Sequence, residues 1–445
     1  MIAVHDHHDE MLRRRFKSLT EADKDYWSFK GNSRREYGHG MFQYPAMMVP
    51  QVVEAILTQA CSVHPDIERV GDPFSGSGTI MTESMMRGLA FSGTDINPLA
   101  VLLCRVKSGP FLIDALKDKA DDLLAQVEED GRWAVEANFP NRDKWFGREV
   151  QIALSKVRRA IRKERTNWAR RFFWVALADV ARATSNSRTS TFKLHIRTQE
   201  DINSRFCDPV STFKKVLARN IQHFEEQATK LSESDQLVRG HYQREIAVSL
   251  ADVRNVKGQA DVDIVVTSPP YGDNTSTVPY GQYSYLPLQW VDLWDIDVNI
   301  DADCLASTYE IDTRSLGGSK RVKKEEADYI KDRSPAFRNY IKSLDKQPRD
   351  RALRVTAFFR DLDACLFPIL KSLRPGGLMV WTLGNRKVGG KRVPLDRILE
   401  DMLQAHRATL LCKLTRRISS KRMAPKNNIA ETISNETILV MRKAM

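Results

Sequence analysis

The chain has 445 residues, of which 42% are hydrophobic and 28% charged, and its formal net charge is +12. Its length is enough for two or three domains' worth of core, and its composition excludes a disordered or fibrous protein. Because no apolar run reaches transmembrane length and no signal peptide is recognisable, we expect an intracellular protein without a membrane partner.

The positive charge is spread along the chain, with basic runs at 148–171, 320–324, 338–354 and 413–426. Such a field attracts a polyanion, and nucleic acid is the first candidate. A basic protein without such a partner is the alternative that charge alone leaves open. The six cysteines include no CxxC pair, so we expect reduced thiols and no metal site.

The first predicted elements alternate between helix and strand. An amphipathic helix is expected within 41–60, and a short strand at 68–74. Residues 75–89 predict a glycine loop that opens a helix, and 91–97 a second strand that ends on an acid. Strand, glycine loop, helix, strand and acid form the first half of a Rossmann-like unit.

Two long segments interrupt the expected parallel sheet. Residues 110–245 are charged and helical in pattern, and a second irregular stretch spans roughly 296–352. The other predicted elements are strands at 246–253, 261–271, 378–385, 409–414 and 436–443, helices at 353–373 and 394–405, and a turn at 374–377. We therefore predict one α/β domain made of 1–110 and 246–445, with a helical inserted domain at 111–245 and a second insertion at about 296–352.

The string DPFSGSGT at 72–79 is the most informative segment near the N-terminus. Gly76 and Gly78 permit positive φ and a close approach of a ligand to the backbone, and the helix that follows presents free N–H groups. Asp72 would repel a pyrophosphate but suits the ammonium or sulfonium end of S-adenosylmethionine. Asp95 ends the next strand, where an acid binds ribose hydroxyls. A structural turn is the alternative.

A third acid, Asp252, follows the strand at 246–253. Strand ends of a doubly wound sheet share one crevice, so Asp252 is expected to accept a hydrogen bond from the adenine amino group of the cofactor. A helix N-cap is the alternative. The predicted cofactor residues of these three strand ends are Asp72, Pro73, Phe74, Gly76, Gly78, Thr79, Asp95, Ile96, Asp252 and Val253.

An apolar run at 263–266 predicts a buried central strand, and Ser268-Pro269-Pro270-Tyr271 follows it. Two prolines stop the strand and make the turn rigid. The amino group of a nucleobase is a poor nucleophile because its lone pair is delocalised. The Ser268 hydroxyl and the Pro269 carbonyl are expected to hold its N–H bonds and direct that lone pair at a methyl group. Tyr271 offers a face on which a flipped base can stack.

These motifs resemble the N-4/N-6 amino-methyltransferase family of bacterial DNA modification, over about 30–110 and 246–445. DPFSGSGT is similar to the family's cofactor motif, and Ser268 to Tyr271 to its catalytic motif, with Ser268 also beside the cofactor. Tyr44 and Pro45 resemble the segment that closes over the methionine end of the cofactor. The resemblance implies a Rossmann-like S-adenosylmethionine-dependent methyltransferase sheet with a mostly helical inserted domain.

In the resembling family, a serine at the first catalytic position is typical of cytosine-N4 enzymes, whereas adenine-N6 enzymes usually have Asp or Asn there. The expected activity is therefore site-specific methylation of DNA at N4 of cytosine, in restriction-modification or a related process. Adenine-N6 methylation and RNA base methylation are the catalytic alternatives. A recognition subunit that binds the cofactor without catalysis is another, although both motifs are intact.

The expected partner is double-stranded DNA, and the expected location is the cytoplasm, at the nucleoid. A separately acting cognate restriction endonuclease, and a monomer or a dimer, are left open. The insertion at 111–245 is the candidate target-recognition domain; the alternative is a helical subdomain with a solvated basic face. The predicted DNA-binding residues are Arg158, Arg159, Arg162, Lys163, Lys320, Arg321, Arg417, Lys421 and Arg422.

Overall fold

The structure is a computed structural model that describes residues 2–256, 261–274, 277–345, 347–418 and 433–445. Its centre is a seven-stranded sheet in the order β10-β11-β7-β6-β1-β2-β5. Neighbouring strands are parallel except where β11 pairs with β7 and with β10. The strands are β1 (Arg69–Asp72), β2 (Ala90–Asp95), β5 (Ile246–Leu250), β6 (Val262–Thr267), β7 (Leu373–Gly384), β10 (Thr409–Arg417) and β11 (Asn435–Arg442).

Two hydrophobic cores cover opposite faces of this sheet. Alternate residues of one strand belong to different cores, as the pleat requires: Val380 faces one core, and its neighbours Met379 and Trp381 face the other. The first core contains α2 (Pro50–Val63), α3 (Thr79–Met85) and α4 (Pro98–Lys107), and the second contains α16 (Arg349–Ser372) and α17 (Leu395–Ala405). Helices therefore pack on both faces, as expected for a doubly wound sheet.

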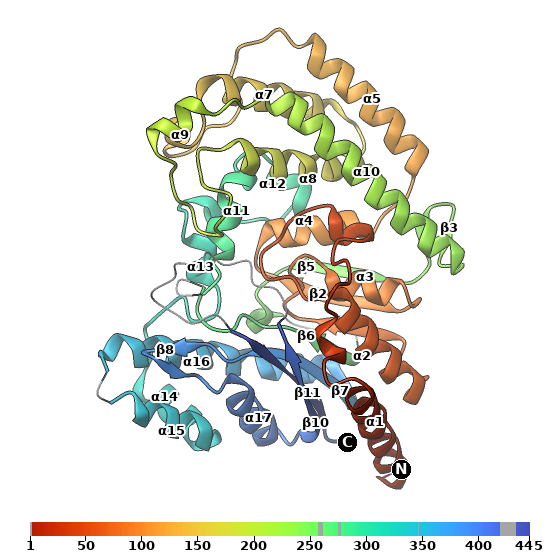
Figure 1. The fold of residues 1–445 in the computed structure, drawn as a ribbon, viewed down its shortest axis with the longest axis vertical. Helices are drawn as coiled ribbons and strands as arrows, with labels where there is room; N and C mark the ends of the chain where they lie inside the picture. The colour runs from red at the N-terminus through yellow and green to blue at the C-terminus, as the bar shows by residue number, and fades with distance from the viewer. Residues whose placement is uncertain (1, 257–260, 275–276, 346, 419–432) are drawn as a thin grey trace.

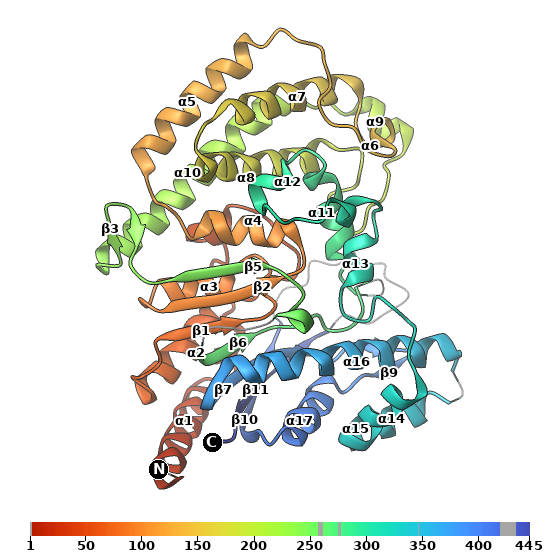
Figure 2. The ribbon, with the colours of Figure 1, turned by 180° about the vertical axis from the view of Figure 1, so that it is seen from behind.

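The helices inserted between β2 and β5 lie beyond the β5 edge of the sheet, at the top of Figures 1 and 2. They are α5 (Ile113–Glu129), α6 (Arg142–Trp145), α7 (Arg148–Lys163), α8 (Asn167–Thr184), α9 (Gln199–Ser204) and α10 (Pro209–Glu233), followed by the hairpin β3 (Leu237–Val238) and β4 (His241–Tyr242). Phe172, Phe173 and Trp174 of α8 are fully buried, so the aromatic residues of this insertion form its core.

A second group of short helices separates β6 from α16: α11 (Tyr280–Leu288), α12 (Leu293–Ile296), α13 (Glu310–Arg314), α14 (Lys324–Arg333) and α15 (Pro335–Ser343). The N-terminal helix α1 (Ile2–Ala22) packs against α2 and β10, and the hairpin β8 (Lys387–Val388) and β9 (Lys391–Arg392) follows β7. Figure 2 shows α14 and α15 at the end of the molecule opposite the inserted helices. No helix within the described residues is both long and apolar enough to cross a membrane.

The structure confirms the predicted fold class, a Rossmann-like sheet with a mostly helical insertion. It corrects the turn expected at 374–377, which lies inside β7. Val262 pairs with Leu373, but Ile264 already pairs with Leu378. The residues between these two pairs form an irregularity within the strand, because the proline and glycines there interrupt the ladder without ending it.

Candidate active site

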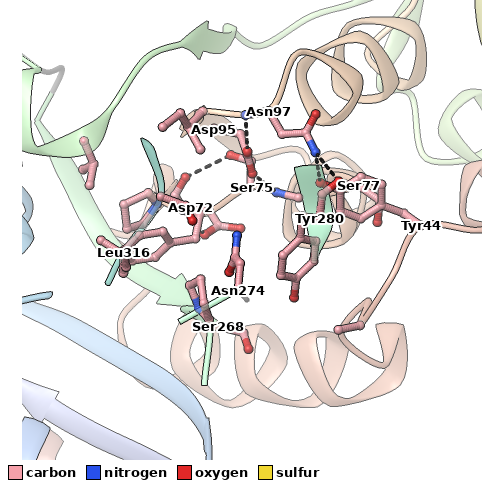
Figure 3. A pocket seen from close by; sticks show the side chains of 18 of the residues that line it. Tyr44, Asp72, Ser75, Ser77, Asp95, Asn97, Ser268, Asn274, Tyr280 and Leu316 are labelled. Carbon is pink, nitrogen blue, oxygen red and sulfur yellow. Dashed lines mark hydrogen bonds between the residues drawn. The ribbon is translucent and has the colours of Figure 1, made fainter. Parts of the chain in front are cut away.

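An inner cavity lies where the parallel strands β1, β2, β5 and β6 end (Figure 3). Asp72 and Asp95 are the last residues of β1 and β2, Asp252 follows β5, and Ser268 follows β6. Ligands of open α/β sheets bind in this crevice at the carboxyl ends of the strands. Predicted site residues that line it are Tyr44, Pro45, Asp72, Pro73, Phe74, Gly76, Thr79, Asp95, Ile96, Asp252, Val253, Ser268 and Pro270.

Two carboxyl groups, the buried Asp72 and the partly exposed Asp95, line the inner cavity. Asp72 is 2% exposed, and its Oδ1 accepts hydrogen bonds from Thr267 Oγ1 at 2.7 Å and from the Phe74 amide at 3.1 Å. Burial raises the pKa of Asp72 to about 7 and that of Asp95 to about 6. Carboxyl groups that lack a full set of partners favour a bound cation, because a positive charge restores their ionised form.

The glycine loop is held from both sides. The Gly76 amide donates to Asp95 Oδ2 at 2.8 Å, and the fully buried Lys107 donates to the Ser77 carbonyl at 2.7 Å. Gly78, which was predicted to touch the cofactor, has φ +76°, and a Cβ there would lie 2.9 Å from Cys104 Sγ. Glycine is thus required at this position by backbone conformation and by packing against α4.

Asp252 lies in the inner cavity but already has a charged partner. Its Oδ1 and Oδ2 both accept from the Arg254 guanidinium, at 2.9 Å from Nε. It also accepts from the Arg254 amide and thereby caps a short 3-10 helix. The helix-cap role considered from the sequence is therefore present. A ligand can use only those lone pairs of Asp252 that these bonds leave free.

Several residues that line the inner cavity carried little signal in the sequence. Tyr280 stacks on Tyr44 with ring centroids 5.8 Å apart, and Figure 3 shows this pair across the cavity from Asp72. The Asn97 amide donates to Tyr44 Oη at 3.0 Å and to Ser284 Oγ at 2.8 Å. Leu316, from the second insertion, also lines the cavity. The Asn-Pro pair after Asp95, a helix-start pattern, was the one local signal available.

A wider outer groove opens next to the inner cavity. Ser268, Tyr44 and Tyr280 line both spaces, and Pro269 and Tyr271 line the groove. Among the described residues, nine lysines and arginines line it against three acids: Lys30, Arg34, Arg35, Lys193, Arg351, Arg354, Arg386, Lys387 and Arg416 against Asp273, Asp350 and Glu436. Ser268 therefore lies at the junction between a carboxylate-bearing cavity and a basic groove.

The predicted DNA-binding residues of α7 do not line this groove. Arg162 pairs with Asp292 at 3.1 Å, Arg158 donates to the Glu136 carbonyl, and Lys163 is exposed at the end of α7. Arg159 is a correction: it is 7% exposed, and its guanidinium donates to Asp130 at 2.7 Å and to the Ala134 carbonyl at 2.8 Å. Its hydrogen bonds are made inside the protein, so its role is structural.

The structural role of Arg159 can be tested by measuring the stability of variants. We expect Arg159→Ala to lower the free energy of unfolding by about 1 to 3 kcal/mol, because it removes the buried bonds to Asp130 and the Ala134 carbonyl, while Arg132 still pairs with Asp130. Arg162→Ala, nearly one turn further along the same helix and about half exposed, is the matched control and should cost less than about 1 kcal/mol. Urea denaturation of both variants checks this, and equal stabilities would contradict the structural role of Arg159.

The other predicted contacts lie elsewhere. Lys320 pairs with Asp350, a groove residue, at 2.8 Å, and Arg321 is exposed nearby. Arg417 is 75% exposed near Asp25. Lys421 and Arg422 lie outside the described residues; the described residues that flank them, Ile418 and Ile433, line the groove.

Comparison with known proteins finds methyltransferases of similar sequence. The chain is 28% identical, over 97% of its length and 95% of the relative's, to the type II methyltransferase M.MvaI of Kocuria varians. A 96-residue stretch is 35% identical to the type II methyltransferase M.MjaII of Methanocaldococcus jannaschii, over 22% of this chain and 18% of that one. The rRNA methyltransferase AviRa of Streptomyces viridochromogenes aligns over 89% of this chain and 86% of its own with 12% identity, at a TM-score of only 0.30. No family model matches the chain.

Strand order, glycine loop and strand-end acids together define a Rossmann-like, S-adenosylmethionine-dependent methyltransferase. Within that class, the chain is similar to a type II methyltransferase over nearly its whole length. The inner cavity fits the methyl donor, because the buried Asp72 carboxyl suits its cationic end and the Asp95 carboxyl can accept from ribose hydroxyls. Phe74, Ile96 and Val253 supply apolar walls for an adenine ring.

Proposed function

We propose that this protein transfers a methyl group from S-adenosylmethionine to N4 of cytosine in double-stranded DNA, at a specific site. The observation that carries the proposal is the place of Ser268, between the cavity for the methyl donor and a basic groove. The relatives are type II methyltransferases, and a serine at this position of the resembling family is typical of cytosine-N4 enzymes.

Residues at three strand ends bind different parts of the cofactor. Asp72 and the Tyr44–Pro45 segment bind the methionine end, Asp95 binds the ribose hydroxyls, and Asp252 with Val253 binds the adenine. The bound donor supplies a methyl group on a sulfonium, which is a good leaving group. Gly78 acts through loop packing instead of touching the ligand.

The chain's contribution to the reaction is to orient the amino group. Ser268 Oγ and the Pro269 carbonyl accept its two N–H bonds, so that the nitrogen lone pair is directed towards the inner cavity. Pro269 and Pro270 fix both acceptors beforehand, which keeps reorganisation in the transition state small. Tyr271 lines the groove beside Ser268, where a base extruded from the duplex can stack on it.

DNA lies in the outer groove in this proposal. Its basic residues come from four separate parts of the chain: 30–35, 193, 351–354 and 386–416. The positive charges of those that are exposed, Lys30, Arg35, Lys193 and Arg351, neutralise phosphates and give binding that is independent of sequence. We infer that the protein acts in the cytoplasm, at the nucleoid. It requires no partner endonuclease, and either a monomer or a dimer can act.

Mass spectrometry of nucleosides tests the reaction. Purified protein, DNA and S-adenosylmethionine with a labelled methyl group should yield labelled N4-methylcytosine. Labelled N6-methyladenine would keep the mechanism and overturn the base assignment. Label that appears only when RNA replaces DNA would overturn the substrate, and no label in either would leave a binding protein without catalysis.

Salt dependence of binding tests the groove. Arg351 is exposed at the start of α16 and lines the groove. We expect Arg351→Ala to weaken binding to all DNA sequences and to reduce the slope of log affinity against log salt by about 1. Arg162→Ala, which removes one arginine from α7, should leave the slope unchanged. The reverse result would move the duplex from the groove to α7.

A further inference from the structure

A chain of hydrogen bonds connects the candidate catalytic serine to a buried ion pair. Ser268 Oγ lies 3.3 Å from Tyr271 Oη, which lies 2.9 Å from Glu436 Oε1. The other carboxylate oxygen of Glu436 pairs with the Arg416 guanidinium, and Arg416 Nε donates to the Trp27 carbonyl at 2.9 Å. Glu436 was not among the predicted site residues; it lies near the start of β11.

The proton positions along this chain follow from which groups can donate. Glu436, ion-paired with Arg416, can only accept, so the single hydroxyl proton of Tyr271 must point at Glu436. Tyr271 Oη can then only accept from Ser268, and the hydroxyl proton of Ser268 must point at Tyr271. The lone pairs of Ser268 Oγ are left for the other side, where the inner cavity and the outer groove meet.

We propose that Glu436 is a positioning residue that, through the Tyr271 hydroxyl, orients Ser268 as a hydrogen-bond acceptor and takes up the proton released when the base amine is methylated. This inference rests on the proposed function and deepens it. A serine hydroxyl free to rotate presents its proton to the base in part of its orientations. The Tyr271 and Glu436 contacts remove those orientations before the base arrives, which is electrostatic preorganisation.

The same chain gives the surplus proton a route. The methylated nitrogen carries one proton more than the product. That proton passes to Ser268 Oγ while the Ser268 proton passes to Tyr271 Oη and the Tyr271 proton to Glu436. Ser268 and Tyr271 are unchanged at the end, and Glu436 becomes a neutral carboxylic acid. The base leaves with a neutral, methylated amino group. Glu436 returns the proton to solvent once the product has gone.

The surrounding backbone fixes this arrangement. The Tyr271 ring packs against Gly384 so closely that a Cβ there would lie 2.4 Å from Tyr271 Cδ2. Gly384 pairs with Glu436 in the ladder between β7 and β11. The strand pairing that places the glycine under the ring therefore also places the carboxylate at the hydroxyl. Sequence positions 271, 384 and 436 meet only because β11 inserts next to β7.

Removal of single atoms tests the relay. Tyr271→Phe keeps the ring for stacking but removes the hydroxyl, and Glu436→Gln keeps the shape but removes the proton acceptor. Single-turnover rates of methyl transfer to DNA should fall roughly 10- to 100-fold in each variant. Affinities for S-adenosylmethionine and for DNA, from calorimetry and fluorescence anisotropy, should stay within about twofold. Tyr242→Phe, which removes a tyrosine hydroxyl bonded to the Leu89 carbonyl far from the site, is the matched control and should react at the wild-type rate.

The double variant decides whether the two groups act together. Groups of one relay are non-additive, so Tyr271→Phe with Glu436→Gln should be no slower than the slower single variant. Rate losses that multiply, a wild-type rate in Tyr271→Phe, or losses that appear in affinity instead of rate would each overturn the relay. Wild-type protein that methylates no DNA would overturn the proposed function as well, whereas active wild type with equally active Tyr271→Phe overturns the relay alone.

Discussion

Ser268→Ala should lower the rate of methyl transfer by roughly 100- to 1000-fold while leaving the methyl donor bound as in the wild type. The variant removes the acceptor that holds one N–H of the base amine, so its lone pair stays delocalised in the ring. The backbone that lines the inner cavity is unchanged, because Pro269 and Pro270 still set the turn. The loss should therefore appear in the reaction step and not in cofactor affinity.

Two measurements check this expectation together. Single-turnover kinetics with saturating DNA give the rate, and isothermal titration calorimetry gives the affinity for S-adenosylmethionine. Ser62→Ala, an exposed serine of α2 that bonds only its own helix, is the matched control and should be normal in both. An equal loss of cofactor affinity in Ser268→Ala would contradict the assignment of Ser268 to the amine and place it in cofactor binding instead.

Asp72 should make cofactor binding depend on pH. Burial raises its pKa from 3.8 to about 7, so near neutrality a large share of the free protein carries a neutral Asp72. A cationic ligand favours the ionised form, so it must displace a proton below that pH. Affinity for S-adenosylmethionine should therefore rise with pH through about 7 and level off above it.

The contribution of Asp72 to the stability of the folded protein changes with pH in the opposite direction. The folded pKa lies above the ordinary value of 3.8, so between about pH 4 and pH 7 the folded protein keeps a proton that the unfolded chain has released. This group accordingly favours the folded state at the acid end of that window and loses its contribution as pH rises through 7. Bound S-adenosylmethionine should offset the loss, and the shift in melting temperature it causes should grow with pH.

Asp72→Asn is the variant that checks both statements. Asparagine keeps an oxygen for the Thr267 hydroxyl and the Phe74 amide but carries no charge, so cofactor affinity should fall roughly 10- to 100-fold. The cofactor affinity of this variant should also become independent of pH between about pH 6.5 and 8.5. This range lies above the pKa of Asp95, which is about 6. Calorimetric titrations of both proteins across this range measure the effect. A pH dependence that survives in Asp72→Asn would transfer the role to another group.

Local sequence was sufficient to predict those parts of the candidate site that consist of consecutive residues. Asp72 to Thr79 combine an acid, two glycines and a helix start, and Ser268 to Tyr271 combine a hydroxyl with two prolines. The backbone rules for glycine and proline act within a few residues, so these turns form in any context that supplies the flanking strands. The seven strands were recognisable for the same reason, because their apolar runs are continuous or alternate.

The outer groove could not be predicted from local sequence in this way. The α7 arginines attracted attention because they are dense in sequence, but one of them, Arg159, is buried on Asp130. The groove's positive charge instead comes from residues that are sparse in the chain, such as Lys30, Lys193 and Arg351. Density along a chain says little about density on a surface, because a helix presents its side chains on all its faces.

The individual strands, the cofactor loop and the candidate catalytic turn could be predicted from the sequence, because each depends on forces that act between near neighbours. Their surroundings could not be predicted in this way: the stack of Tyr280 on Tyr44, the basic groove, and the contact of Glu436 with Tyr271 are visible only in the folded chain. These depend on which strands pair and where the insertions fold back. Such long-range contacts are selected by burial of the whole core, which no short segment encodes.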